Sequence, residues 1–490
     1  MIGSRSLMAD KAFKRQKLFG LVLVITIPLI CSVIFLLAQK TWFNGISIVC
    51  SKWNDELFYY KQVQAMIDHG HPLGYWGYNE GHSLYGNFAA WNPANYILYA
   101  LIGKIFGWGY YTPIIINLLL WSLTFGLIYI FLKPDIRQWV GIVAVFLALS
   151  INIRYIFSCT PESICASFLV IWCLLTIRYN ETEKPVYFIV SNLIMTYLAA
   201  MRGYYAAFVL ITLAVLIRKK KWIALAIQTV IVLADLFLFL MLCRFFAATY
   251  FMDTVHFDNL TNIRSFAGSV RYGMTETLGF MKEAFKGESM RGVWYIAFLI
   301  LIICEFVVFI HKKDIVSFSV IIASGGLLIA MWSLYNAQEG ARNLMACEAA
   351  LLLITVCLAD NLFLGIAAGL IIGIACWGSH DAFYIKLPVK DNALKNAIEN
   401  TDLTAVMPLS EDEWDNTVIW PLYTQFNGLY ALPSGMGVNC LRDEYVFDNY
   451  STLKSKYIVA EQGSDMDAFL NENKLSKIAN VGNLQIYTLR

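Results

Sequence analysis

The sequence predicts an all-α polytopic membrane domain of about eleven transmembrane helices, followed by a small extracytoplasmic α/β domain. Composition is the first observation: of 490 residues 58% are hydrophobic and only 15% charged, and the mean hydropathy is +0.58. A soluble protein is nearer one half apolar and one quarter charged. The second observation is a change to polar composition near residue 378. We therefore expect a membrane domain at 1–377 and a separate domain at 378–490.

The membrane domain is expected from apolar runs of spanning length, which is about 20 residues. These runs lie at 18–38, 112–132, 139–157, 163–179, 185–201, 203–217, 222–250, 292–311, 314–335, 344–359 and 361–377. The first run follows the basic segment "KAFKRQK", but no small-residue cleavage site comes after it. It is interpreted as a retained anchor rather than a signal peptide.

Topology follows from the basic loops, because Lys and Arg concentrate on the cytoplasmic side. With a cytoplasmic N-terminus, the loops "KPDIR", "RKKK" and "HKK" all fall inside, provided that 93–108 does not span. That segment is short and carries Lys104 midway, so we expect an interfacial or re-entrant helix. If 93–108 spans, every later loop lies on the opposite side of the membrane and the basic loops fall outside. If it does not span, the outer side receives the loop at 39–111, the loop at 251–290 and the C-terminal domain.

The tail alternates between two kinds of segment. Helix-like stretches are "NALKNAIENT" and "SDMDAFLNENKLSKI", and β-rich ones are "TAVMPL", "NTVIWPLY", "SKYIVAEQ" and "NLQIYTLR". This alternation predicts an α/β domain of ordinary size.

An acidic pair, Asp55 and Glu56, follows the first span in the stretch "SKWNDELFYY". Asn54 can cap a helix that runs to about His69, with Gly70 as its stop, and Tyr59, Val63, Met66 and Ile67 give it one apolar stripe that would lie on the membrane surface. The helix dipole keeps first-turn carboxylates ionised. An ionised carboxylate there can act as a base or hold a divalent cation, and alternatively both acids only stabilise the helix.

Four arginines are expected at the outer lip of the membrane: Arg154, Arg202, Arg244 and Arg342. The positive-inside preference disfavours this placement unless an anion holds them. Glu162 could neutralise one, and snorkelling to the interface explains one or two. A phosphate or pyrophosphate would satisfy the whole cluster of guanidinium groups.

Other polar residues leave alternatives open. Asp235 and Glu305 fall within spans, where they could relay protons in a transporter or form hydrogen bonds between helices. His71, His82 and His256 face outward without the spacing of a metal motif. No P-loop, dinucleotide-binding motif or internal repeat is present.

Several stretches together resemble the GT-C superfamily of membrane glycosyltransferases. They are "WNDELFYYKQV", "NPANYILYALIGKIFG", "TPES" and "EGARNLMACEA", the last with Asn343 and Ala346 where the superfamily usually has Tyr and Pro. The resemblance implies a polyprenyl-phosphate sugar donor and transfer outside the cytoplasm. It implies Asp55 or Glu56 as base or metal ligand, and an arginine loop that approaches the donor phosphate.

These inferences converge on a transferase of the cell membrane that moves a hexosyl or pentosyl group to an envelope glycan, lipid or protein, with no nucleic-acid partner. Arg342, Arg202 and Arg154 would bind the donor phosphate, and Tyr59, His82, Glu162 and His256 would contact substrate. A divalent cation is the one cofactor that the acidic pair could need. The alternatives are a transporter or flippase for a lipid-linked or anionic substrate, and a non-catalytic partner in envelope assembly.

The predicted topology can be tested by labelling. A cysteine placed by Ser464→Cys should react with an impermeant maleimide in intact cells, because the C-terminal domain is expected outside. The matched variant Lys219→Cys should stay unlabelled. Labelling of Lys219→Cys alone would reverse the topology.

Overall fold

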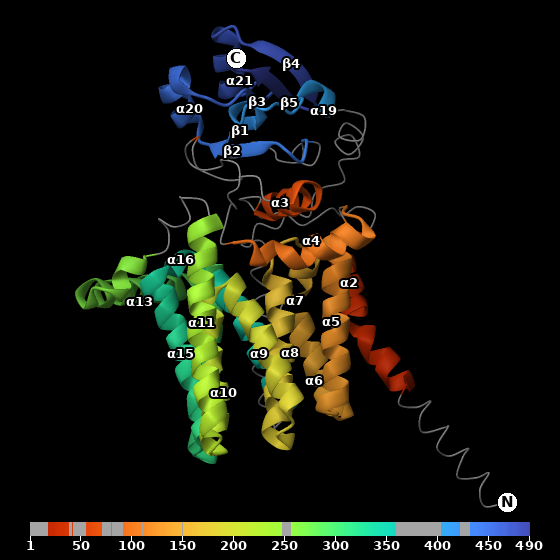
Figure 1. Ribbon diagram of the computed structural model, residues 1–490, viewed down its shortest axis with the longest axis vertical. Coiled ribbons are helices and arrows are strands. Elements are labelled where there is room, and N and C mark those ends of the chain that lie inside the picture. Colours follow the sequence, from red (N-terminus) through yellow and green to blue (C-terminus); the bar gives the residue numbers. More distant parts are fainter. Residues whose placement is uncertain are drawn as a thin grey trace, which may run out of the picture.

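The computed structural model shows a bundle of helices with a small α/β domain at one end (Figure 1). The residues that it describes are 18–38, 42, 55–70, 80, 92–109, 111–148, 150–246, 256–358, 403–421 and 432–490. Two helices, α3 (Asp55–His69) and α4 (Ala94–Phe106), lie between the bundle and the domain. We call the end of the bundle that carries them the domain end, and the opposite end the far end.

Six helices within the described residues are long and apolar enough to cross a membrane, so the chain is a multi-pass membrane protein. They are Leu18–Ala38 (which contains α2, Ile27–Ala38), α5 (Thr112–Phe131), α8 (Glu162–Thr182), α11 (Trp222–Phe246), Arg291–Lys312 of α14 (Met290–Lys312) and α15 (Ile315–Leu334). Shorter apolar helices are α4, α6 (Ile136–Ala148), α9 (Pro185–Met201) and the segment of η3 (Gly203–Phe208) and α10 (Val209–Arg218). The expected number of about eleven spans is therefore not confirmed. The run expected at 361–377 lies outside the described residues, and α16 (Ala337–Leu358) covers the one expected at 344–359.

The span expected at 139–157 is not α-helical to its end. Its described residues form α6, α7 (Ser150–Arg154) and then the 3₁₀ turn η2 (Tyr155–Phe157), and residue 149 lies outside the described residues. The cause is Asn117 on α5, whose side-chain amide donates to the backbone carbonyls of Tyr155, Ile156 and Ser158 at 2.9–3.2 Å. These carbonyls bond a neighbouring helix instead of their own, so the regular helix ends before them.

The basic loops gather at the far end of the bundle. Glu183, which ends α8, accepts from Lys219 at 2.9 Å and from Lys221 at 3.0 Å. Arg218 lies 3.8 Å from Asp314, which caps α15. The helices α3 and α4 and the α/β domain lie at the opposite end (Figure 1). One end is thus basic, as the sequence predicts, and its placement in the cytoplasm stays a prediction from the positive-inside preference.

Helix α4 runs across the domain end of the bundle (Figure 1). Its 13 residues reach about 20 Å, which is less than the apolar thickness of a bilayer. Its Lys104 ammonium donates to the carbonyl oxygen of Ile67 on α3 at 3.0 Å. The segment 93–108 therefore has the form of an interfacial helix.

The C-terminal domain is built on one five-stranded mixed sheet with the strand order β2-β1-β3-β5-β4. Its strands are β1 (Thr417–Pro421), β2 (Gly437–Leu441), β3 (Tyr457–Glu461), β4 (Ser476–Val481) and β5 (Leu484–Thr488). The strands β2, β1 and β3 are parallel, whereas β5 is antiparallel to both β3 and β4. Around it lie α19 (Leu403–Val406), η6 (Trp414–Asn416), α20 (Asp443–Asn449), η8 (Tyr450–Thr452) and α21 (Asp465–Glu472).

Most of the segments expected in the tail are found, with two errors. The stretch "TAVMPL" was expected as a strand but contributes to helix α19, and "SKI", expected as the end of a helix, begins β4. The turn at Lys474, whose φ is +58°, ends α21 early and redirects the chain into the strand. "NALKNAIENT" lies outside the described residues.

The two faces of the sheet are covered by different parts of the chain. Helices α20 and α21 cover one face through Val446, Met466 and Leu470. The other face packs on α3, whose Phe58 and Ala65 join the cluster that contains Val418, Trp420 and Val459. The domain therefore shares its core with a helix some 350 positions earlier in the chain.

Helix α3 is consequently buried on two sides. Tyr59 and Val63 of the expected apolar stripe belong to the core of the bundle, and Met66 and Ile67 pack against it. The expectation that α3 lies on the membrane surface is thus wrong in one respect: the stripe faces α4 and the bundle rather than lipid. Lys61 and Gln62 on its opposite side are fully buried under the domain.

Polar contacts fasten the domain to the loop between the first two spans. Glu80 accepts from the backbone amides of Lys454 at 2.6 Å and Ser455 at 2.7 Å. The His69 ring lies 3.1 Å from the Ser434 hydroxyl. The ammonium of Lys61 donates to the carbonyl oxygen of Leu432 at 2.5 Å.

Lys61 should make the docking of the domain depend on pH. Burial lowers its pKa from 10.5 to about 7, against an opposing effect of Asp68. Between these values the unfolded chain binds more protons, so stability should rise with pH by about 2 kcal/mol from pH 7 to pH 9. Thermal unfolding at several pH values should show this rise.

The variant Lys61→Met should lose the rise, because it removes the titrating group. Lys104→Met, which changes an exposed lysine of α4, serves as the control and should keep it. The same pH dependence in Lys61→Met and in the unaltered protein would exclude Lys61 as the cause.

Candidate functional site

The acidic pair begins the helix that the sequence predicts. Helix α3 starts at Asp55 and ends at His69, and Gly70 follows with φ of +77° and a bond from its amide to the carbonyl of Met66. The pair therefore occupies the first turn, where the helix dipole favours ionised carboxylates. The side chains of Asp55 and Glu56, and residue Asn54, lie outside what the structure describes.

A buried ion pair lies at the domain end of the bundle. Arg202 Nη2 donates to Glu162 Oε1 at 2.8 Å, and the two side chains are only 3% and 2% exposed. Arg202 Nη1 donates to Asn343 Oδ1 at 2.9 Å and to the Tyr204 hydroxyl at 3.2 Å. This cluster connects the start of α8, the end of α9 and α16, and we call it the arginine cluster.

The position of Glu162 is fixed by the loop before it. Besides its three bonds to carbonyls of residues 155–158, Asn117 accepts from the Tyr99 hydroxyl at 2.7 Å. The Ser163 hydroxyl accepts from the Trp121 indole at 2.9 Å. Helix α5 thus holds both the loop before "TPES" and Ser163 at its end, with Glu162 as the first residue of α8.

Arg202 is positioned by the segment that leads into α4. The side-chain amide of Asn92 donates to the Ala200 carbonyl at 2.8 Å, and that of Asn95 donates to the Met201 carbonyl at 3.2 Å. These carbonyls belong to the last turn of α9, where no following turn of the helix supplies amides to bond them. Arg202 itself is extended, so its side chain leaves the helix axis toward Glu162.

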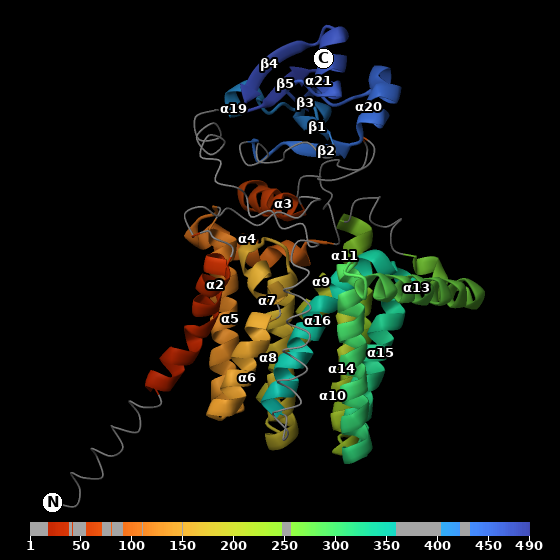
Figure 2. The same cartoon turned by 180° about the vertical axis from the view of Figure 1, so that it is seen from behind.

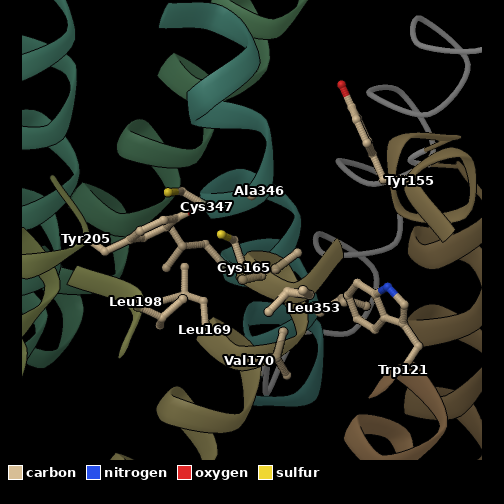
Figure 3. Close-up of a cluster of buried hydrophobic side chains, with 14 of the residues drawn as sticks. Trp121, Tyr155, Cys165, Leu169, Val170, Leu198, Tyr205, Ala346, Cys347 and Leu353 are labelled. Atoms are coloured by element: carbon tan, nitrogen blue, oxygen red, sulfur yellow. The ribbon is translucent and has the colours of Figure 1, made fainter. Parts of the chain in front are cut away.

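A layer of apolar side chains supports the arginine cluster. Cys165 lies one turn after Glu162, Cys347 one turn after Asn343, and Tyr205 three residues after Arg202. Figure 3 shows these three side chains close together, above Leu198 and Leu169. The layer excludes water beneath the ion pair, which strengthens the electrostatic attraction within it.

The remaining predicted site residues occupy different surroundings. Arg154 is buried, with its guanidinium carbon 5.3 Å from the centre of the Tyr155 ring. Tyr59 is buried against Tyr96, with 5.0 Å between ring centres, and interacts electrostatically with Arg202. His256 is exposed where the 3₁₀ turn η4 (Phe257–Leu260) begins. The structure gives the positions of these residues, and their roles in binding substrate or phosphate stay predictions.

Three further predicted residues are exposed or outside the described residues. Arg244 is exposed at the end of α11. His82 lies outside the described residues, as does the side chain of Arg342, whose backbone belongs to α16. Its neighbour Asn343 bonds Arg202, so this part of α16 lies against the arginine cluster.

The acids inside the bundle form bonds between helices. The side chain of Asp235 on α11 interacts with that of Thr196 on α9, and Ser324 on α15 donates to Glu305 on α14 at 3.2 Å. Glu348 on α16 was not singled out from the sequence, although it lies in "EGARNLMACEA". It is fully buried, and neither carboxylate oxygen has a hydrogen-bond partner among the described residues.

No group of three or more His, Cys, Asp or Glu side chains that could hold a metal occurs among the described residues. The side chains of Asp55 and Glu56 were not part of that set, so a cation held by this pair stays a prediction.

Comparison with known proteins gives the fold. No protein-family model matches the chain, and no curated protein matches it. Among solved structures, the apo oligosaccharyltransferase of Archaeoglobus fulgidus aligns with a TM-score of 0.50 at 12% identity, covering 91% of this chain and 69% of that one. ArnT from Cupriavidus metallidurans bound to undecaprenyl phosphate aligns at 12% identity with a TM-score of 0.44, covering 96% and 98%. The alignment with the apo oligosaccharyltransferase shows a shared fold, which agrees with the resemblance of the sequence to the GT-C superfamily.

The ion pair makes a testable contribution to stability. Glu162→Gln keeps the shape of the side chain but leaves a buried guanidinium without its counter-charge, which typically costs about 3–5 kcal/mol. Thermal or denaturant unfolding in detergent should show a loss of this order.

The control is the exposed pair of Arg178 and Glu181 on the same helix, 2.6 Å apart. Glu181→Gln should cost no more than about 0.5 kcal/mol. Equal losses of unfolding free energy in the two variants would show that burial of the Glu162 pair does not add to its effect on stability.

Proposed function

We propose that this protein is a membrane glycosyltransferase that moves a sugar from a polyprenyl-phosphate carrier to an acceptor outside the cytoplasm. One observation carries the proposal: α3, which begins with Asp55, and the arginine cluster lie at the same end of a bundle with the GT-C fold. Sugar transfer needs a base for the acceptor and a cation for the departing phosphate. This end of the bundle offers candidates for both.

The donor is inferred from the side of the membrane. Nucleotide sugars are cytoplasmic, so an enzyme that works at the opposite surface requires a sugar carried by lipid. The carrier would lie in the bilayer beside the bundle, with its phosphate at the membrane surface. A guanidinium fork suits such a phosphate in charge and in geometry.

Arg342 is our candidate for the phosphate contact, with Arg154 in support. Arg202 also has a structural role, because its guanidinium already bonds Glu162 and Asn343. Through Asn343 it holds the part of α16 that carries Arg342. Contact of Arg202 with the donor phosphate would require that one of these bonds is exchanged for it.

The transfer step follows from these roles. The acceptor hydroxyl gives its proton to the carboxylate of Asp55 while its oxygen forms a bond to the anomeric carbon. The bond from that carbon to the phosphate oxygen breaks, and its electron pair leaves with the lipid phosphate. Arg342 stabilises the charge that develops there. A divalent cation at Asp55 and Glu56 is the alternative role for the pair.

The remaining assignments complete the proposal. Tyr59, Glu162, His82 and His256 are candidates for contacts with sugar or acceptor, which would be an envelope glycan, a lipid or a protein. A transporter would use acids in the middle of the membrane, but Glu305 hydrogen-bonds the Ser324 hydroxyl of a neighbouring helix and Asp235 interacts with Thr196 of another. Such bonds are the ordinary structural use of these side chains.

The role of the acidic pair can be tested with purified protein and a polyprenyl-phosphate sugar. Asp55→Asn keeps the size of the side chain and removes the charge, so turnover should fall by roughly 100-fold or more. Binding of the donor should change little, because the phosphate contact is elsewhere.

Glu56→Gln is the matched variant one residue along, rotated by about 100° around the helix axis. It should reduce turnover less than Asp55→Asn does, and a larger loss would exchange the two roles. Undiminished transfer by the double variant would refute the proposed chemistry.

A further inference from the structure

Helix α13 (Ile263–Ala284) lies across the bundle at its domain end and projects beyond it (Figures 1 and 2). It leads directly into α14. The residues just before it are bonded to the end of α15: the side-chain amide of Asn259 donates to the Ser333 carbonyl, and the backbone amide of His256 donates to the Leu334 carbonyl. Helix α13 therefore lies level with the end of α15. The ends of two long apolar helices therefore place α13 at a boundary of the membrane. None of the proposed catalytic or phosphate-binding residues belongs to it.

One side of α13 is fixed against the bundle. Gly273 and Thr277 are its buried residues. The Trp332 indole donates to the Thr277 hydroxyl at 2.9 Å, and a Cβ on Gly273 would lie 2.7 Å from the Trp332 side chain. The close approach at Gly273 permits one rotation of the helix about its axis, so the direction of every other side chain follows from its position.

The adjacent side of α13 is apolar and exposed. At 100° a residue, Ile263, Met274, Leu278 and Phe285 project about 80–140° around the helix axis from Gly273, on the face that touches the bundle. Ile263 and Phe285 are each 82% exposed, and Leu278 is 56% exposed. A helix that lies in the plane of the membrane can bury such a side in the boundary between headgroups and acyl chains.

Basic residues come next around the helix. Arg264, Arg271 and Lys282 project about 160–180° from the bundle face, whereas Glu276 and Glu283 project at about 280–300°, on the side opposite the apolar residues. Among the ion pairs of the described residues none involves the three bases. We call these three the basic stripe of α13.

This order of faces fits one environment. With the apolar side turned to lipid, the acids face water and the basic stripe points away from the bundle at the level of the headgroups. Lys and Arg beside an apolar helix side complement anionic lipids, and each near a charged surface contributes about 1 kcal/mol, or about fivefold in affinity.

We propose that the basic stripe of α13 binds the headgroups of anionic phospholipids, while Met274, Leu278 and Phe285 enter the lipid beneath them. The occupant is the surrounding membrane rather than the sugar donor. The site would collect anionic lipid beside α14 and α15, on which α13 packs.

The test compares retained lipids by native mass spectrometry. The full-length protein is purified in micelles that contain equal amounts of phosphatidylglycerol and phosphatidylcholine. The unaltered protein should retain phosphatidylglycerol in excess. The triple variant Arg264→Gln/Arg271→Gln/Lys282→Gln should lower the ratio of the two lipids at least tenfold, and added salt should reduce the excess in the unaltered protein.

The control removes the same charge elsewhere. Lys474→Gln/Lys477→Gln/Arg490→Gln alters exposed residues of the C-terminal domain and should leave the ratio unchanged. A second variant, Leu278→Asn/Phe285→Asn, should reduce retention of both lipids. An unchanged ratio in the α13 triple variant, or an equal fall in the control, would overturn the proposal. All these substitutions are at exposed positions, and melting temperatures verify that each variant is folded.

Discussion

The structure depends on the burial of one helix between two cores. One side of α3 contributes Tyr59 and Val63 to the core of the bundle, and the other contributes Phe58 and Ala65 to the core of the sheet. Neither core is closed at this place without α3. The same helix begins with Asp55 and Glu56, so the packing that assembles the protein also determines where the acidic pair lies. The bonds from Lys61 and Glu80 to the C-terminal domain restrict its rotation.

The arginine cluster has a similar double role. A buried ion pair contributes little net stability, but loss of either partner is costly, so such pairs specify one arrangement more than they stabilise it. The pair of Arg202 and Glu162 joins α8 to the end of α9, and Asn343 joins both to α16. Three segments that are distant in the sequence are thus brought to one place. A transferase site needs this fixed geometry, because a small displacement of the reacting groups reduces turnover strongly.

The sequence predicted what depends on local pattern. The helix from Asp55 to His69, its stop at Gly70, the interfacial α4 and the gathering of basic loops at one end all follow from caps, length and charge. Features that depend on distant contacts were not predictable. Lys61 and Gln62 make the second side of α3 polar in the sequence, so its burial could not be expected. The carbonyl of Leu432 that accepts a hydrogen bond from Lys61 lies 371 positions away. The 3₁₀ turn at Tyr155–Phe157 likewise depends on Asn117, which is separated from it by some 40 positions.

The central claim is that a lipid-linked sugar binds at the domain end of the bundle and not within it. The most direct measurement is an electron cryomicroscopy map of the purified protein with a polyprenyl-phosphate sugar. The account predicts density for the phosphate beside Asn343 and Arg202, with the sugar toward the first turn of α3. Density for the ligand midway along the bundle, beside Asp235 or Glu305, would contradict the account and indicate transport.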